Sequence, residues 1–248
     1  MIAVVIPSYN EGEVIASLIL KISEVLSPPH LIIVVDDSPN DLTQKAIEST
    51  GKSNLVSIHR KTKGGRGSAV IEGIKIAVSR DCSQIVEMDA DFSHPPEELN
   101  SILSEAKTRG LDLLIGSRYL PESKILNWPL SRRIFSRCAN WLARSVLRIP
   151  IHDYTNGYRC YSRPAAEQIV ATCGKLGKGF IALSEILVNL YYRGLTVGER
   201  PTVFVNRVRG ESSVNLNEIT GALMGLFRIY GLKRELQAKN VKVANINN

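Results

Sequence analysis

Two carboxylates, Asp89 and Asp91, stand two positions apart, with one residue between them, directly after the apolar run 84–88. Such a run is typical of a buried strand, so the pair is predicted at the carboxyl end of that strand, where ligands bind in open α/β sheets. Carboxylates with this spacing supply hard oxygen ligands for a divalent cation, and the cation can in turn hold a diphosphate. The alternative is an acidic turn before a helix, with Asp91 or Ser93 as its N-cap and two prolines in the first turn.

The segments that must position this pair alternate between strand and helix patterns over the first 115 residues. Because the strand-like runs are apolar almost throughout, they are predicted to be buried on both faces, in a mainly parallel sheet covered by helices. The predicted strands are 2–6, 31–35, 55–58, 85–88 and 111–115, and the predicted helices are 11–26, 41–50, 66–79 and 95–108.

The second half of the chain has a different pattern. A basic helix is predicted at about 130–147, followed by a polar, aromatic-rich stretch at 153–161. Another helix is predicted near 183–192, strands near 196–205 and a last helix-like segment near 216–236.

Polar side chains follow each of the five predicted strands of the first half. Because the carboxyl ends of parallel strands meet at one edge of a sheet, we expect these groups to form one continuous polar edge. Taken singly, Asp36-Asp37 is equally compatible with a turn and helix cap, and the glycine-rich loop 64–67 with a flexible connection or an anion-binding loop. The groups are Tyr9 and Glu11, then Asp36 and Asp37, the loop 64–67, the Asp89/Asp91 pair, and Gly116-Ser117-Arg118-Tyr119.

Composition limits the classes of function. The chain has 248 residues, 44% of them apolar, which fits one large domain with a sizeable core. Its net charge of +7 favours an anionic partner: nucleic acid, a nucleotide or an anionic membrane surface. Aromatic residues make up only 6%, and the basic residues fall on one helix and on loops of the polar edge, so nucleic acid is not the expected partner.

The four cysteines are far apart and form no CxxC pair, which predicts free thiols in a reducing compartment. The first strand begins at the second residue, so no signal peptide is expected, and no apolar run is long enough to predict a transmembrane helix.

The basic helix combines arginines with large apolar side chains. The bland interpretation is an amphipathic helix with a solvated basic face. The functional one is an interfacial element, in which arginines contact anionic headgroups while Trp and Leu enter the boundary layer. Its arginines are Arg132, Arg133, Arg137, Arg144 and Arg148, and Trp128, Ile134, Phe135, Trp141 and Leu142 lie among them.

Five motifs together resemble the polyprenyl-phosphate sugar transferases among the family-2 glycosyltransferases, above all the dolichol-phosphate mannosyltransferase group. The resemblance covers about residues 1–215 and implies a GT-A fold, a Rossmann-like three-layer α/β sandwich with a mainly parallel central sheet. The motifs, in chain order, are Pro7-Ser8-Tyr9-Asn10-Glu11, Val35-Asp36-Asp37-Ser38-Pro39, Met88-Asp89-Ala90-Asp91, Gly116-Ser117-Arg118-Tyr119 and the segment 207–212.

The reaction that this resemblance implies is hexose transfer from a nucleotide sugar to a polyprenyl (dolichyl) phosphate, with inversion at the anomeric carbon and with Mg²⁺ or Mn²⁺. The donor expected first is GDP-mannose; the alternative is a glucosyltransferase that uses UDP-glucose. An inactive relative that only binds a partner remains the rival from another class.

The resemblance also implies roles for individual residues. Pro7, Tyr9 and Glu11 line the nucleoside pocket, and Asp36 contacts the base. Asp89 and Asp91 hold the metal against the diphosphate, with Ala90 between them in the nucleotide site, and Arg207 approaches the phosphates. Arg118, Arg132 and Ser136 line the side where sugar and acceptor phosphate meet; with Asp91 they form the expected catalytic set.

Two positions depart from the family pattern: Ser93 stands where relatives often carry a metal-binding Gln, and Ser213 where they often carry Lys. His94 lies beside the acidic pair, but with two prolines after it we expect it to shape the turn.

The resemblance further implies a catalytic domain at 1–215 and a C-terminal amphipathic helix and tail at 216–248. The helix is expected to pack on the domain, to lie in a membrane interface or to bind a small membrane subunit. The expected location is peripheral, on the cytoplasmic face of a membrane, with no nucleic-acid partner.

Overall fold

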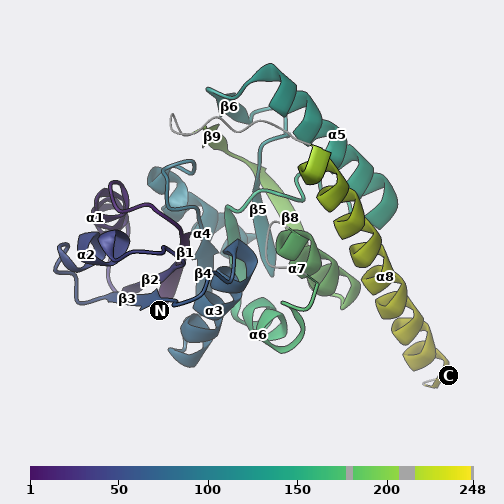
Figure 1. The fold of residues 1–248 in the computed structure, drawn as a ribbon. Helices are drawn as coiled ribbons and strands as arrows, with labels where there is room; N and C mark the ends of the chain where they lie inside the picture. The colour runs from purple at the N-terminus through teal and green to yellow at the C-terminus, as the bar shows by residue number, and fades with distance from the viewer. Residues whose placement is uncertain (177–180, 207–215, 247–248) are drawn as a thin grey trace.

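The computed structural model describes residues 1–176, 181–206 and 216–246. A seven-stranded sheet forms its centre, in the order β3-β2-β1-β4-β7-β5-β8 (Figure 1). Neighbouring strands are parallel except where β7 pairs antiparallel with both β4 and β5, so the predicted mainly parallel α/β sheet is confirmed. Its strands are β1 (Ile2–Ser8), β2 (His30–Asp36), β3 (Leu55–His59), β4 (Gln84–Glu87), β5 (Leu113–Ser117), β7 (Arg159–Ser162) and β8 (Val197–Pro201).

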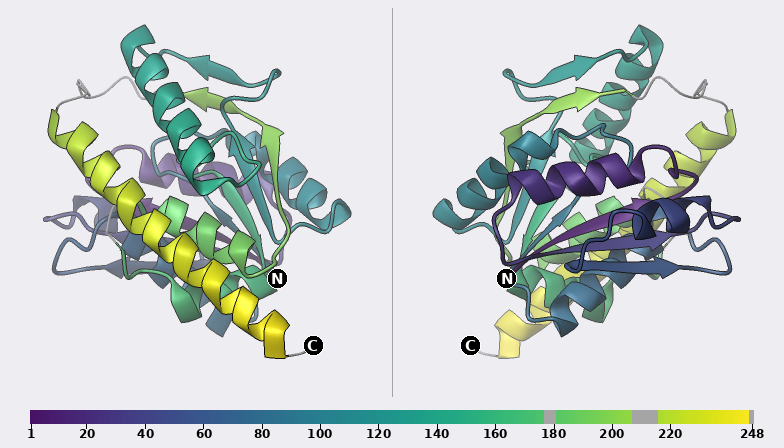
Figure 2. Two further views of the ribbon diagram at one scale, coloured as in Figure 1. Left: turned by 90° about the vertical axis from the view of Figure 1, so that its right-hand side faces the viewer. Right: turned by 90° about the vertical axis from the view of Figure 1, so that its left-hand side faces the viewer.

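Helices cover both faces of this sheet and make three layers (Figure 2). One face carries α1 (Ile15–Val25), α2 (Leu42–Glu48) and α4 (Leu99–Thr108), which continues from the short turn η1 (Pro96–Glu98). The other carries α3 (Arg66–Ser79), α6 (Arg163–Thr172) and α7 (Ile181–Tyr192). Successive residues of β1 alternate between the two cores, because side chains of a strand point to opposite faces.

Two long helices and a small sheet lie outside these layers. The helix α5 (Leu130–Leu147) runs beside α8 (Leu216–Ile246), and α8 packs along α7 (Figure 1). Ile229 and Leu236 of α8 are buried in the same core as α7. The small sheet pairs β6 (Lys124–Leu126) with β9 (Val203–Val205). No helix in the described ranges is both long and apolar enough to cross a membrane.

The predicted helices at 66–79 and 130–147 are confirmed to the residue. Three elements were not predicted from the sequence: β6 and β7, whose short segments lack an apolar run of strand length, and α6, a short helix that directly follows β7. The strands expected near 196–205 are β8 and β9, which lie in different sheets and are separated at Thr202.

The strand order creates a crevice at one edge of the sheet. From β1 the chain proceeds to β2 and β3 on one side, whereas β4 lies on the other side of β1. Loops that leave the carboxyl ends of β1 and β4 therefore diverge, and ligands of open α/β sheets bind at such a point. The Asp89/Asp91 pair follows β4 and lies at this crevice.

Candidate active site

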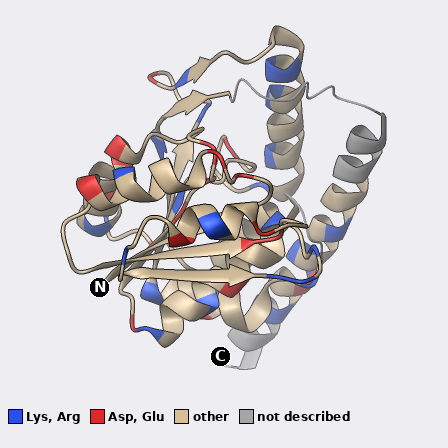
Figure 3. Ribbon diagram, turned by 60° about the vertical axis from the view of Figure 1, so that its left-hand side comes forward, with Lys and Arg blue, Asp and Glu red and all other residues tan. Residues whose placement is uncertain are grey.

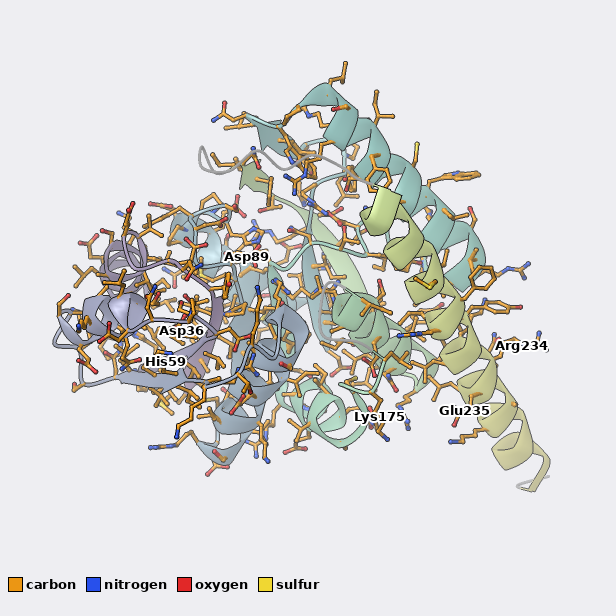
Figure 4. The ribbon with its side chains drawn as sticks, viewed as in Figure 1. Asp36, His59, Asp89, Lys175, Arg234 and Glu235 are labelled. Atoms are coloured by element: carbon orange, nitrogen blue, oxygen red, sulfur yellow. The ribbon has the colours of Figure 1, made fainter. Side chains whose placement is uncertain are left out.

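Ser38 ties the ends of β1 and β2 together. Its hydroxyl donates to Asp36 Oδ1 at 2.6 Å and accepts the backbone N–H of Asn10 at 2.8 Å. Asp36 is fully buried, yet among the described residues neither its Oδ2 nor the buried hydroxyl of Ser8 has a hydrogen-bond partner. Buried polar atoms without partners are rare, so these two atoms mark a place where a ligand can supply hydrogen bonds. Figure 4 labels Asp36 in this N-terminal half of the molecule.

The glycine-rich loop after β3 is held by a carboxylate of the protein itself. Asp37 accepts the backbone N–H groups of Gly64 and Gly65 at 3.1 and 2.7 Å and pairs with the Arg60 guanidinium at 2.5 and 2.7 Å. The anion that these N–H groups bind is therefore Asp37, and the loop is a fixed connection. Burial opposes ionisation of Asp37, but Arg60 and the two amides outweigh it and lower the pKa of this carboxyl.

Asp89 is bound by two cationic or polar side chains. Arg66 donates to Asp89 Oδ1 through Nε at 3.0 Å and Nη2 at 2.7 Å, and His94 Nε2 lies 3.2 Å from Asp89 Oδ2. Burial disfavours the charged carboxylate, but the charge of Arg66 and the hydrogen bond from His94 outweigh it and hold the pKa of Asp89 well below its usual range. His94 was predicted only to shape the turn, and its contact with Asp89 was not predicted.

The second carboxylate has a different environment. Asp91 Oδ1 accepts the backbone N–H of Ser93 at 3.1 Å, which fixes the turn after β4. Over the described part of the chain, no group of three or more His, Cys, Asp or Glu side chains could hold a metal ion. Hard carboxylate oxygens at the crevice fit Mg²⁺ or Mn²⁺ only if a diphosphate supplies further oxygens.

A buried ion pair organises the other end of the crevice. Arg118 follows β5, and its guanidinium makes a bidentate pair with Asp153 at 2.8 Å for both contacts. Arg118 is 8% exposed and Asp153 is fully buried. Burial opposes the charged form of Arg118, but Asp153 outweighs it and raises the pKa of Arg118, and the charge of Asp89 adds to this effect. The carboxylates of Asp153 and Asp89 therefore both favour the charged form of Arg118.

The predicted acceptor-side residues are brought together around aromatic rings. The hydroxyl of Tyr119 donates to Ser136 Oγ of α5 at 2.6 Å. The guanidinium carbons of Arg118 and Arg132 lie 5.3 and 5.2 Å from the ring centre of Trp128. Arg132 and Ser136 lie one turn apart on α5, whereas Arg118 follows β5. Trp128 lies beside both guanidinium groups and Tyr119 bonds Ser136, and sequence spacing does not show this meeting of α5 with the loop after β5.

A cavity of about 450 Å³ opens beside Arg118, between the loop after β5 and α5. Its cationic lining from α5 is Arg133 and Arg137, which the sequence analysis had placed only in the general basic helix. Figure 3 shows the Lys and Arg positions that recur along α5. Apolar side chains complete the wall, namely Leu120, Pro121, Ile125, Leu130 and Ile134. Such a lining suits an anion attached to an apolar chain.

The remaining predicted residues take the following places. Pro7 is the penultimate residue of β1, and Tyr9 is 42% exposed at its end, with Lys63 Nζ 3.5 Å from the centre of its ring. Glu11 accepts two backbone N–H groups at the start of α1 through its carbonyl oxygen, and Ala90 is buried between the two aspartates. Arg207 lies outside the described residues.

A Rossmann-like, mainly parallel sheet with acidic side chains at its crevice and a cationic, apolar cavity beside Arg118 is the architecture expected of a glycosyltransferase of the GT-A class. The sequence profile of glycosyl transferase family 2 matches residues 3–170, and the chain belongs to this family, as the five motifs predicted. It is thus an enzyme of the glycosyltransferase class.

Curated relatives cover nearly the whole chain. Polyprenol monophosphomannose synthase of Mycolicibacterium smegmatis is 35% identical over 89% of this chain and 83% of its own. Undecaprenyl-phosphate mannosyltransferase of Micrococcus luteus is 32% identical over 90% and 91%. A solved structure of glucosyl-3-phosphoglycerate synthase from Mycobacterium tuberculosis, in complex with Mn²⁺, UDP and phosphoglyceric acid, has a TM-score of 0.66 at 18% identity and covers 93% of this chain and 78% of its own. This likeness confirms the fold.

Proposed function

We propose that this enzyme transfers a mannosyl group from GDP-mannose to a polyprenyl phosphate at a membrane surface. The observation that carries the proposal is the cavity of about 450 Å³, whose wall combines arginines and apolar side chains. A polyprenyl phosphate has that same combination of a dianionic head and an apolar chain. The two mannosyltransferase relatives support the sugar and the acceptor class.

The donor nucleotide would occupy the crevice at the ends of β1, β2 and β4. Pro7, Tyr9 and Glu11 would line the nucleoside, and Asp36, whose Oδ2 lacks a protein partner among the described residues, would accept a hydrogen bond from the base. The diphosphate would lie beside Asp89, Ala90 and Asp91, and Arg207 is proposed to approach it.

The acceptor would meet the sugar beside Arg118, with Arg132 and Ser136 on the same side. An oxygen of the acceptor phosphate attacks the anomeric carbon; the new C–O bond forms as the bond to the nucleoside diphosphate breaks, with inversion. The acceptor is already ionised near neutral pH, so no general base is needed to remove a proton. Arginines can dock it through paired hydrogen bonds, which fixes its direction of attack.

A bound Mg²⁺ or Mn²⁺ would stabilise the negative charge that develops on the leaving diphosphate. Asp91 and Asp89 are the residues proposed to hold it. The structure of glucosyl-3-phosphoglycerate synthase was solved with Mn²⁺. Transfer assays with each metal decide between Mg²⁺ and Mn²⁺ in this enzyme.

We also propose that α5 and α8 rest on the cytoplasmic face of a membrane. Leu130, Ile134 and Trp141 are 68%, 55% and 69% exposed and recur at spacings of four and seven residues, so they form one stripe along α5. Phe227 of α8 is 77% exposed, and α5 has no acidic residue. Residues 1–215 would then be the catalytic domain, and 216–248 the interfacial helix and tail.

The test of the reaction is radiolabel transfer to a short-chain polyprenyl phosphate, with GDP-mannose and UDP-glucose run in parallel and either metal present. We expect transfer from GDP-mannose and a loss of about 100-fold or more in Asp91→Ala, the scale of removing one electrostatic stabiliser. Asp41→Ala, which removes an exposed carboxylate from the start of α2, is the matched control. Transfer from UDP-glucose alone would replace mannose by glucose in the proposal.

The test of the membrane surface is flotation with anionic vesicles at low salt. Trp141→Ser combined with Phe227→Ser should leave the protein in the bottom fraction. Leu42→Ser is the matched control, because Leu42 is 62% exposed on α2, away from α5 and α8. If the wild type does not float, a small membrane subunit becomes the partner to test on this surface.

A further inference from the structure

Arg66, the first residue of α3, binds both acidic side chains at the end of β4. Its Nη1 donates to Glu87 Oε1 at 2.7 Å, while Nε and Nη2 both donate to Asp89 Oδ1. Glu87 is fully buried, and its second oxygen accepts the hydroxyl of Tyr161 at 2.7 Å. The guanidinium is therefore fixed from the side of Glu87 and presents its other edge to Asp89.

The second oxygen of Asp89 is occupied as well. Nε2 of His94 lies 3.2 Å from Oδ2, within hydrogen-bond distance. With Arg66 on Oδ1, each oxygen of the carboxylate therefore has a neighbour at hydrogen-bond distance. His94 is itself fully buried and stacks on Tyr158 with ring centres 5.1 Å apart, so it cannot swing away freely.

The chain makes room for this guanidinium at Gly157. A Cβ atom at that position would lie 1.8 Å from Arg66 Nη2 and 2.8 Å from Arg66 Cζ, far inside any permitted contact. The same Cβ would be 3.3 Å from Asp89 Oδ1. The backbone before β7 therefore closes over the Arg66–Asp89 pair, and a side chain there would displace it.

We infer that Arg66 is a positioning residue that competes with the divalent cation for Asp89, so that the cation enters only together with the nucleoside diphosphate. Without nucleotide, a cation would have to approach a carboxylate whose two oxygens already accept hydrogen bonds and whose charge Arg66 offsets. The diphosphate supplies new oxygens and negative charge, and this makes binding favourable. The inference rests on the proposed function, because it concerns the cation of that reaction.

The experiment measures Mn²⁺ affinity by electron paramagnetic resonance, with and without GDP. The variant is Arg66→Met with Glu87→Gln, which leaves the net charge unchanged and gives Tyr161 an uncharged acceptor. We expect the wild type to bind Mn²⁺ at least about tenfold more tightly with GDP. In the double variant, the affinity without GDP should rise by about tenfold or more, the value of releasing one charge-assisted hydrogen bond.

Two further variants separate this role from a structural one. Arg163→Met with Glu167→Gln removes an exposed pair on α6 of the same charge types and should change neither affinity. Arg66→Lys keeps a cation beside Asp89 and should resemble the wild type. A merely structural role for Arg66 predicts weaker or unchanged Mn²⁺ binding in the double variant, never stronger binding.

The outcomes distinguish the two proposals. Unchanged or weaker Mn²⁺ binding without GDP in the double variant overturns the inference about Arg66 alone. Equal Mn²⁺ affinity of the wild type with and without GDP also overturns it. If neither GDP nor UDP brings Mn²⁺ to the wild type, the metal-assisted function fails, whatever the variant does.

Discussion

The Arg118–Asp153 pair offers the most decisive test of how the site is held together. Asp153→Asn keeps the size of the side chain and an acceptor oxygen, but removes the charge that offsets Arg118. Because the pair is buried and bidentate, the change leaves an unbalanced guanidinium, which costs roughly 3–5 kcal/mol of unfolding free energy. For a chain of this length that loss lowers the melting temperature by about 6–20 °C.

Asp153 does more than balance a charge. It also accepts the backbone N–H groups of Arg118, Thr155 and Asn156 at 3.0, 3.2 and 3.0 Å, and Asn at this position can satisfy only part of that set. The unfolding free energy in urea can be measured in a double-mutant cycle. The four proteins are the wild type, Arg118→Met, Asp153→Asn and the double variant. The double variant should be more stable than Asp153→Asn, because it no longer buries a lone cation, yet it should still lack transfer activity.

The dependence on pH gives a second readout of the same pair. Burial alone would raise the pKa of Asp153, but the charge of Arg118 outweighs it and lowers that pKa below its unfolded value. The stabilisation is therefore fully present above the unfolded pKa of about 3.9 and is lost as the pH falls through the folded pKa. A loss below about 1 kcal/mol at pH 7 in Asp153→Asn would refute the reasoning, since that is the value of a solvated surface pair.

Three further changes have definite expected outcomes. Cys138 is exposed, whereas burial raises the pKa of Cys160 to about 12, so a disulfide reagent at pH 8 should react quickly with Cys138, and Cys138→Ser should remove that fast phase. Gly73→Ala places a Cβ 2.4 Å from a valine methyl of β1 and should lower unfolding free energy in urea by about 1–3 kcal/mol, whereas Gly231→Ala meets no atom within 4 Å and should not. Asp37→Asn should destabilise the protein at pH 6, with the two stability curves converging in acid, because the lowered pKa of Asp37 makes its contribution disappear as the pH falls through that folded value.

Each of these outcomes can be contradicted directly. A fast phase that survives Cys138→Ser would mean that a buried or half-buried cysteine reacts as readily as the exposed one. A Gly73→Ala variant as stable as Gly231→Ala would mean that α3 and β1 are not in the contact described. Parallel stability curves for Asp37→Asn and the wild type between pH 6 and pH 3 would show that Asp37 has the same pKa folded and unfolded.

Local patterns in the sequence determined the elements of the fold. The apolar runs of β1 and β2 and the periodic segments of α3 and α5 depend on neighbours only a few residues away, so their type and, for both helices, their bounds were predicted. Asp89 and Asp91 were placed at a strand end for the same reason. The family motifs then supplied the class of enzyme, which the match to residues 3–170 confirms.

Contacts across long stretches of chain were decided only in the tertiary structure. The antiparallel strand β7 fits between β4 and β5, although its four residues have no strand-like apolar run. Arg118 finds Asp153 and Arg66 finds Asp89 through packing of separate elements, and no spacing in the sequence indicates either pair. Hydrophobic periodicity depends on residues within one segment, whereas the partner of a buried charge depends on which segments the whole fold brings together. This is why the sequence named Asp89 and Arg118 but not the side chains that pair with them, Arg66 and Asp153.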